Sequence, residues 1–179
     1  MASKLQINGS SILEDDSMVW SNDATPSGNL SVITLASLAS GSGRIGTEID
    51  RGAGPYEPGL YIAKGYLMWG SALTAGNHLG DLFVLERPND GVTYEGNLSG
   101  TDAAVTSAKF NNLGPRLVFS GVADSTSSGE LQVITSRPFM LSMPLVNVAW
   151  LNRAGVSMHA TTPGYFTIYA YSQFRTATA

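Results

Sequence analysis

The chain contains no cysteine among its 179 residues, so neither a disulfide framework nor a thiolate metal site can form. We therefore expect the hydrophobic core alone to hold the fold together. No run of about 18 apolar residues occurs, which predicts that there is no transmembrane helix. The N-terminal sequence MASKLQINGSS lacks the apolar stretch of about 7–15 residues that a signal peptide needs, so we expect synthesis in a cytoplasm without export by the usual route.

Charge is also scarce. Asp, Glu, Lys and Arg make up 13% of the chain, against roughly 25% in an average soluble protein. A solitary protein in water usually keeps more charge on its surface, so the shortage predicts burial against partners. The net charge is −4 and no cluster of Lys or Arg occurs, which argues against a groove for nucleic acid. The expected partners therefore include neither nucleic acid nor a membrane.

The motifs of metal and nucleotide chemistry are missing or incomplete. His78 and His159 lie in unlike contexts, and neither belongs to an H-x-H or H-E-x-x-H pattern, so no metal site is predicted. Residues 41–46 read G-x-G-x-x-G, but the segment 47–55 that follows cannot form the helix whose N-terminus would hold a pyrophosphate. The sequence therefore predicts no cofactor.

Paired carboxylates are the one enzymatic arrangement that the sequence leaves open. A glycosidase needs two carboxyl groups across a cleft, and the candidates near aromatic residues are Glu57, Glu86, Asp90 and Glu95. Carboxylates in turns are usually only solvated, and none of the many serines lies in a G-x-S-x-G motif. We therefore expect a protein that is not an enzyme and has no catalytic residue.

Short runs of branched and aromatic residues, separated by turn formers, are the main positive signal. Such runs are typical of β-strands, and no helical period persists anywhere in the chain. The sequence predicts an all-β fold, an antiparallel two-sheet sandwich of the jelly-roll kind with about 8–10 strands. The expected strands are residues 30–35, 60–69, 79–87, 116–122, 130–135, 139–143, 145–151 and 165–171.

Several segments carry more specific expectations. Residues 116–122 and 130–135 are expected to pair as a hairpin, and a return strand is expected to begin at Val92 after a turn. Residues 101–110 fit either a short helix or a strand. The polar residues 1–29 form an extended arm or the first strands of a sheet.

We divide the chain into an N-terminal arm, 1–29, and a single sandwich domain, 30–179. Because Trp20 must be buried somewhere, we expect the arm to dock on a neighbouring subunit.

Alternation in the last strand predicts an interface. It places Phe166 and Ile168 on a core face and a row of tyrosines on the opposite face. Water alone does not favour a tyrosine row, so we expect this face to meet another sheet or another subunit. The predicted interface residues are Trp20, Trp69, Tyr165, Tyr169 and Tyr171.

Three stretches, in this order, carry a resemblance to a known family. Residues 47–52 precede a long apolar strand, residues 82–85 run into 89–94, and residues 144–155 precede the final strand of tyrosines. Over residues 45–173 this order resembles the small jelly-roll decoration or cement proteins of tailed bacteriophages.

The resemblance implies a virion structural protein without enzymatic activity. It would sit on the capsid surface, bind between subunits of the major capsid protein and stabilise the shell, after assembly in the cytoplasm of a bacterial host. It also implies a homo-oligomer, with a trimer favoured over a dimer.

The alternative to capsid decoration is a phage tail or fibre protein, or a receptor-binding module that recognises carbohydrate. Such a module would need an exposed aromatic platform, for which Tyr61, Trp69 and Tyr94 are the candidates.

Overall fold

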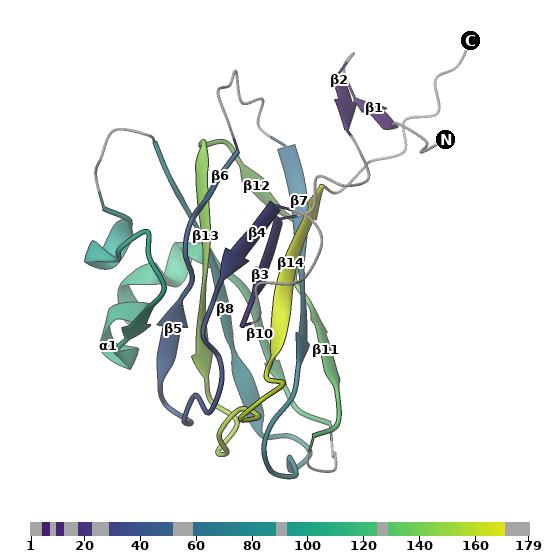
Figure 1. Ribbon diagram of the computed structural model, residues 1–179, viewed down its shortest axis with the longest axis vertical. Helices are drawn as coiled ribbons and strands as arrows, with labels where there is room; N and C mark the ends of the chain where they lie inside the picture. Colours follow the sequence, from purple (N-terminus) through teal and green to yellow (C-terminus); the bar gives the residue numbers. More distant parts are fainter. Residues whose placement is uncertain are drawn as a thin grey trace.

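The computed structural model describes residues 5–7, 10–12, 18–22, 29–51, 59–88, 93–124 and 129–170. Two six-stranded sheets pack face to face, which confirms the all-β sandwich (Figure 1). Sheet I contains β11 (Gln132–Thr135), β7 (Gly59–Leu67), β14 (Gly164–Ala170), β3 (Met18–Ser21) and β4 (Asn29–Val32), with β12 (Phe139–Leu141) also paired to β7. Sheet II contains β10 (Leu117–Val122), β8 (His78–Arg87), β13 (Leu145–Asn152), β5 (Gly43–Ile45) and β9 (Ala103–Val105), with β6 (Ile49–Asp50) also paired to β13.

The strand pairing is that of a jelly roll. Leaving aside the additional strands β4, β6, β9 and β12, eight strands remain in the two sheets. The first of them in sequence pairs with the eighth, the second with the seventh, the third with the sixth and the fourth with the fifth. The antiparallel pairs are β3 with β14, β5 with β13, β7 with β11, and β8 with β10. Sheet I therefore holds the first, third, sixth and eighth strands, and sheet II holds the other four, as the jelly-roll arrangement requires.

The main core lies between the two sheets. Trp20, Trp69, Trp150 and Phe166 are its largest side chains, and each is at most 1% exposed. In β7, Ala63, Gly65 and Leu67 turn toward this core, while Lys64 and Tyr66 are half-buried on the opposite face. The period of two in β7 thus reflects one buried face and one more open face, whereas all four residues of β3 are buried.

Sheet II is covered on its second face as well. The segment 94–116 contains η1 (Glu95–Asn97), α1 (Ser107–Phe110) and η2 (Asn111–Arg116), and it contributes Phe110 and Leu113 to a second apolar cluster against β13 and β8. All eight residues of β13 are consequently buried, which explains its nearly continuous apolar sequence.

The structure corrects two of the local expectations. Segments 116–122 and 130–135 do not form a hairpin, because β10 pairs with β8 in sheet II whereas β11 pairs with β7 in sheet I. No return strand forms after residue 92 within the described part of that segment; Tyr94 bridges to Leu98 around η1 instead. For segment 101–110 the sequence allowed either a strand or a short helix, and both occur: the strand β9 is followed by α1, a single helical turn.

The N-terminal residues divide differently from the predicted arm. Within 1–29, Met18–Ser21 is β3, which lies inside sheet I between β14 and β4. The strands β1 (Leu5–Ile7) and β2 (Ser10–Ile12) pair with each other as a separate two-stranded sheet. None of the helices in the described ranges has the length and apolarity needed to span a bilayer.

Candidate interaction surface

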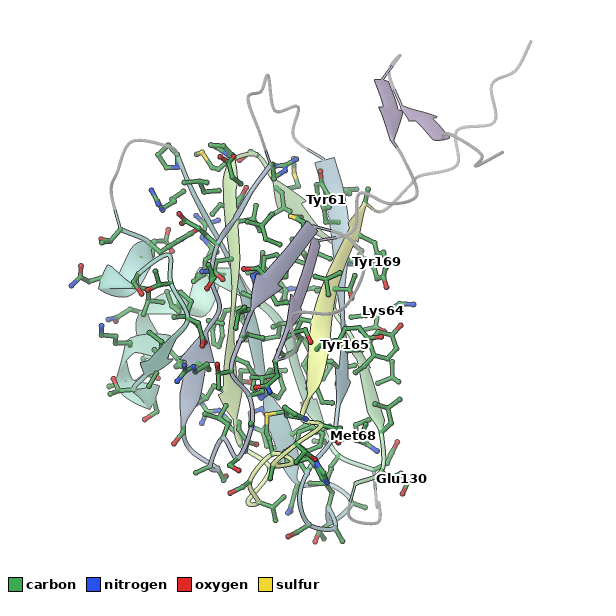
Figure 2. All side chains as sticks on the ribbon, in the orientation of Figure 1. Tyr61, Lys64, Met68, Glu130, Tyr165 and Tyr169 are labelled. Atoms are coloured by element: carbon green, nitrogen blue, oxygen red, sulfur yellow. The ribbon has the colours of Figure 1, made fainter. Side chains whose placement is uncertain are left out.

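The outer face of sheet I carries a group of aromatic and apolar side chains that we call the tyrosine face (Figure 2). Alternation in β7, β11 and β14 turns these residues away from the core. No described segment packs over them in the way that 94–116 covers sheet II. The tyrosine face consists of Ile62, Lys64, Tyr66, Met68, Val133, Thr135, Tyr165 and Tyr169, together with Thr167, which is itself buried at 3% exposure.

Three tyrosines form the centre of this face. Tyr66 on β7 lies directly opposite Tyr165 on β14, and their rings stack with centroids 4.9 Å apart and planes at 22°. Partial burial raises the pKa of the Tyr66 hydroxyl above its ordinary value, and the neighbouring Tyr169 and Tyr165 raise it further. The Nζ atom of Lys64 lies 6.0 Å from the centroid of the Tyr169 ring, within the range of a cation–π contact.

The two sheets differ sharply in charge. Lys64 is the one Asp, Glu, Lys or Arg residue in the six strands of sheet I. The six strands of sheet II contain five such residues: Arg44, Asp50, Asp81, Glu86 and Arg87. The shortage of charge in the chain is therefore concentrated in sheet I, the sheet whose outer face is open.

The structure brings together only some of the predicted interface residues. Tyr165, 36% exposed, and the half-buried Tyr169 lie on the tyrosine face as expected. Trp20 and Trp69 are at most 1% exposed within the chain itself, so the prediction that they contact a partner is wrong. Their indole N–H groups donate to the Thr47 carbonyl at 2.8 Å and to Asn152 Oδ1 at 3.2 Å. Tyr171 lies outside the described residues.

Of the tyrosine face, the predicted interface residues included only Tyr165 and Tyr169, so its members on β7 and β11 were missed. Lys64 and Tyr66 belong to it because β7 pairs with β14 in a register that sets Lys64 opposite Thr167 and Tyr66 opposite Tyr165. Alternation along β7 places Tyr66 on the face opposite Ala63, but only the strand register shows which residues it meets.

A serine, a histidine and an aspartate meet near the start of β8 but do not form a catalytic triad. His78 Nε2 lies 2.9 Å from Asp81 Oδ1 and 3.1 Å from Ser120 Oγ, so one ring nitrogen faces both groups. A triad needs the base to use one nitrogen for the serine and the other for the carboxylate. Asp81 also accepts a hydrogen bond from Arg153 Nε at 2.5 Å, which makes the cluster a surface ion-pair network.

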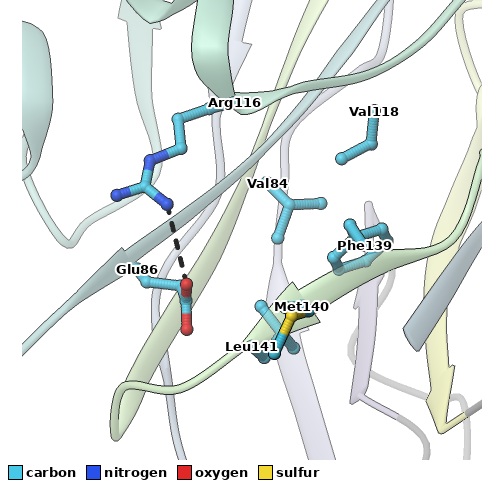
Figure 3. A pocket seen from close by; sticks show the side chains of 7 residues that line it. All are labelled: Val84, Glu86, Arg116, Val118, Phe139, Met140 and Leu141. Atoms are coloured by element: carbon cyan, nitrogen blue, oxygen red, sulfur yellow. Dashed lines mark ion pairs between the residues drawn. The ribbon is translucent and has the colours of Figure 1, made fainter. Parts of the chain in front are cut away.

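Two of the candidate carboxylates lie near a small cavity between the sheets (Figure 3). Glu86 is paired with Arg116 at 3.6 Å, and Arg116 also contacts Glu95 at 3.2 Å. Glu86 further accepts hydrogen bonds from the backbone N–H groups of Ser142 and Met143. Arg116 lies between the two carboxylates and contacts both, so it occupies the place where a glycosidase holds the scissile bond.

The cavity has a volume of about 140 Å³, and its walls are mostly apolar: Val84, Val118, Phe139, Met140 and Leu141. Glu57 and Asp90, the other two candidate carboxylates, lie outside the described residues. Within the described ranges, His, Asp and Glu side chains form no cluster of three that could hold a metal ion.

No protein family model matches the chain, and no curated protein or solved structure matches it either. Its function must therefore be inferred from its own surface, of which the tyrosine face is the most unusual part.

Proposed function

We propose that the chain is a structural protein of a virion, without enzymatic activity, that decorates and stabilises a phage capsid by binding between capsid subunits through the tyrosine face. The observation that supports this most is the composition of sheet I, with one lysine in six strands and a stacked tyrosine pair on its outer face. Tyrosine-rich surfaces that are poor in charge are characteristic of protein–protein interfaces.

The fold and the sequence pattern agree with this proposal. Jelly rolls recur in viral capsid and lectin domains, although a fold alone does not define a function. The order of motifs over residues 45–173 resembles that of phage decoration proteins. The same proposal implies that the protein lies on a capsid assembled in a bacterial host and that its partner is the major capsid protein.

The alternative, a carbohydrate-binding module, finds less support among the described aromatic residues. Trp69 and Tyr94 are 1% and 2% exposed, so neither forms a platform. Tyr61 stacks on Phe139 with centroids 6.5 Å apart, and its hydroxyl accepts a hydrogen bond from Arg51. On the tyrosine face, Tyr66 and Tyr165 turn their ring faces toward each other, which leaves ring edges and hydroxyls for a partner.

Lys64 indicates what the partner surface should contain. A single cation in an otherwise uncharged face loses hydration when the face is covered, so a carboxylate on the shell protein should lie opposite it. The partner surface is expected to be apolar or aromatic around that carboxylate.

Binding to stripped phage capsids tests the proposal. Purified protein should add to the shells in a fixed ratio to the major capsid protein and raise their melting temperature. Tyr165→Ser should weaken binding tenfold or more, because removing a central aromatic residue typically costs over 1.4 kcal/mol. The control Val122→Ser, which removes an exposed side chain from sheet II, should bind as the wild type does.

Two outcomes would contradict capsid decoration. One is the absence of binding to shells at micromolar concentration. The other is assembly of the purified chain by itself into closed particles, which would make it the shell protein instead.

A further inference from the structure

The strands that end the two sheet orders, β11 and β4 in sheet I and β10 and β9 in sheet II, differ in how their free edges are covered. Thr47 N–H donates to the Val32 carbonyl beside β4, and Arg137 N–H donates to the Val118 carbonyl of β10. The pairing of β10 also contains two register shifts, which disrupt its edge. The three-residue strand β9 passes almost at once into α1. For β11, no described residue covers the edge opposite β7.

The hydrogen-bonding direction along β11 identifies which residues face this bare edge. Ser136 N–H donates to the Ala63 carbonyl, in line with the β11–β7 register. In an antiparallel ladder, alternate residues turn both backbone groups to the same side, so Gln132 and Ile134 also face β7. Leu131, Val133 and Thr135 therefore turn their N–H and C=O groups toward the bare edge.

The same edge is unusually apolar. Leu131 and Val133 are 46% and 57% exposed, and Met140 on β12, which pairs with β7 on the same side as β11, is 60% exposed. These are three of the seven exposed large hydrophobic residues in the described part of the chain. The strand sequence Gln-Val-Ile-Thr contains no charge, proline or glycine, the features that usually protect an edge from pairing.

We propose that β11 pairs with β11 of a second copy of this chain, antiparallel and around a two-fold axis, so that sheet I continues from one subunit into the other. The tyrosine faces must lie on the same side of a continuous sheet, so outward side chains must lie opposite outward side chains. Among the registers that meet this condition, the one centred on Val133 pairs all three edge-facing residues with one another: Val133 with Val133 of the partner subunit, and Leu131 with Thr135 of the partner subunit. This register provides about six backbone hydrogen bonds between the subunits.

A second copy fits this edge because the strand is self-complementary. Without a charged residue in β11, no like charges meet at the axis, and the same surface serves on both subunits, as a two-fold interface requires. Four residues span only about 14 Å, so the buried area falls below the roughly 1,600 Å² of a standard interface. The dimer should therefore be weak, with dissociation in the micromolar range.

This pairing leaves the tyrosine face uncovered and doubles its extent on one side of the dimer. The inference does not depend on the proposed function, since it concerns contacts between copies only. It does favour a dimer over the trimer expected from the sequence. Two linked tyrosine faces would bind any repetitive shell more tightly than one.

Sedimentation equilibrium of Val133→Pro and Val133→Thr tests the pairing. Proline lacks the N–H group that faces the bare edge, so it should abolish dimerisation without disturbing the pairing of β11 with β7. Val133→Thr retains the N–H group and the branched shape, so it should still dimerise. Circular dichroism and the melting temperature establish that both variants fold. A wild type that stays monomeric up to several hundred micromolar, or a folded Val133→Pro variant that dimerises like it, would overturn the proposal.

Cross-linking gives a second test that needs no disruption of the edge. The chain has no cysteine, so Val133→Cys introduces a single thiol. A short bis-maleimide should link two Val133→Cys chains at least tenfold faster than two Val122→Cys chains, although Val122 is the more exposed residue at 67%. Equal rates would mean random collisions and would overturn the proposal. The two proposals can be told apart with Tyr165→Ser. If this variant dimerises normally but no longer binds shells, the result supports the proposed function and leaves the β11 pairing unchanged.

Discussion

The three buried tryptophans differ in what their indole N–H groups contact. Trp20 and Trp69 donate to a carbonyl oxygen and to an amide oxygen, whereas Trp150 Nε1 has no hydrogen-bond partner among the residues that the structure describes, although its side chain is fully buried. A buried donor without an acceptor costs about 1–3 kcal/mol, while a satisfied one stabilises the fold by about 1 kcal/mol. The three positions therefore provide a comparison within one core.

We expect Trp150→Phe to destabilise the protein less than Trp20→Phe, by about 1–2 kcal/mol. Both substitutions remove similar volume, but only the first also removes an unpaired polar group, while the second removes a donor from the Thr47 carbonyl. Urea unfolding followed by far-ultraviolet circular dichroism measures both free energies. Equal losses, or a larger loss for Trp150→Phe, would mean that packing alone governs these sites.

The carboxylate of Asp102 connects the two sheets. Arg44 on β5 holds Asp102, the residue before β9, through two hydrogen bonds of 2.7 and 2.8 Å, and Thr34 after β4 donates to the same carboxylate through its backbone N–H and hydroxyl. Burial by itself would raise the pKa of Asp102, but these hydrogen bonds outweigh it and lower the pKa below its ordinary value. The residues after β4 are thereby tied to sheet II.

This cluster should stabilise the protein in a pH-dependent way. Because the pKa of Asp102 is lower in the folded than in the unfolded state, its contribution is complete above about pH 4 and is lost as the pH falls through the folded value. Asp102→Asn should cost about 2 kcal/mol at pH 7, and this difference from the wild type should shrink below pH 4. Chemical unfolding between pH 3 and pH 7 measures it. The exposed Asp124→Asn variant serves as the control, and a pH-independent difference for Asp102→Asn would contradict the assignment.

At the scale of the whole molecule, the jelly-roll order makes the two ends of the chain depend on each other. β3 is the first strand of the sandwich and pairs with the last, β14, and it supplies Met18 and Trp20 to the main core. Without β3, the apolar side of β14 loses a neighbour and a large cavity opens beside Phe166. The limit of the folded unit therefore lies before Met18 rather than at residue 29.

Truncation from the N-terminus tests this limit. A chain that begins at residue 13 should keep the melting temperature of the full chain within a few degrees, because β1 and β2 pair only with each other. A chain that begins at residue 23 should lose its cooperative transition and its near-ultraviolet signal. A cooperative transition that survives removal of residues 1–22 would show that β3 is dispensable.

The sequence by itself determined the local features of this protein. Branched residues and turn formers define the strands, and a period of two places Phe166 and Ile168 inside and Tyr165 and Tyr169 outside. These features depend on near neighbours in the chain, so composition and spacing are enough to predict them. The low number of charged residues also follows from the composition, but the sequence did not reveal that sheet I would contain the fewest of them.

Only the tertiary structure decided which strands meet and which faces remain open. β10 and β11 follow each other in the chain yet join different sheets, since β10 pairs with β8 and β11 pairs with β7. Trp20 and Trp69 point into the core because the two sheets close over them, and the segment 94–116 covers sheet II, while on sheet I Tyr165 stays exposed and Tyr66 and Tyr169 half-buried. Such choices depend on contacts between residues far apart in the chain, which a local pattern does not encode.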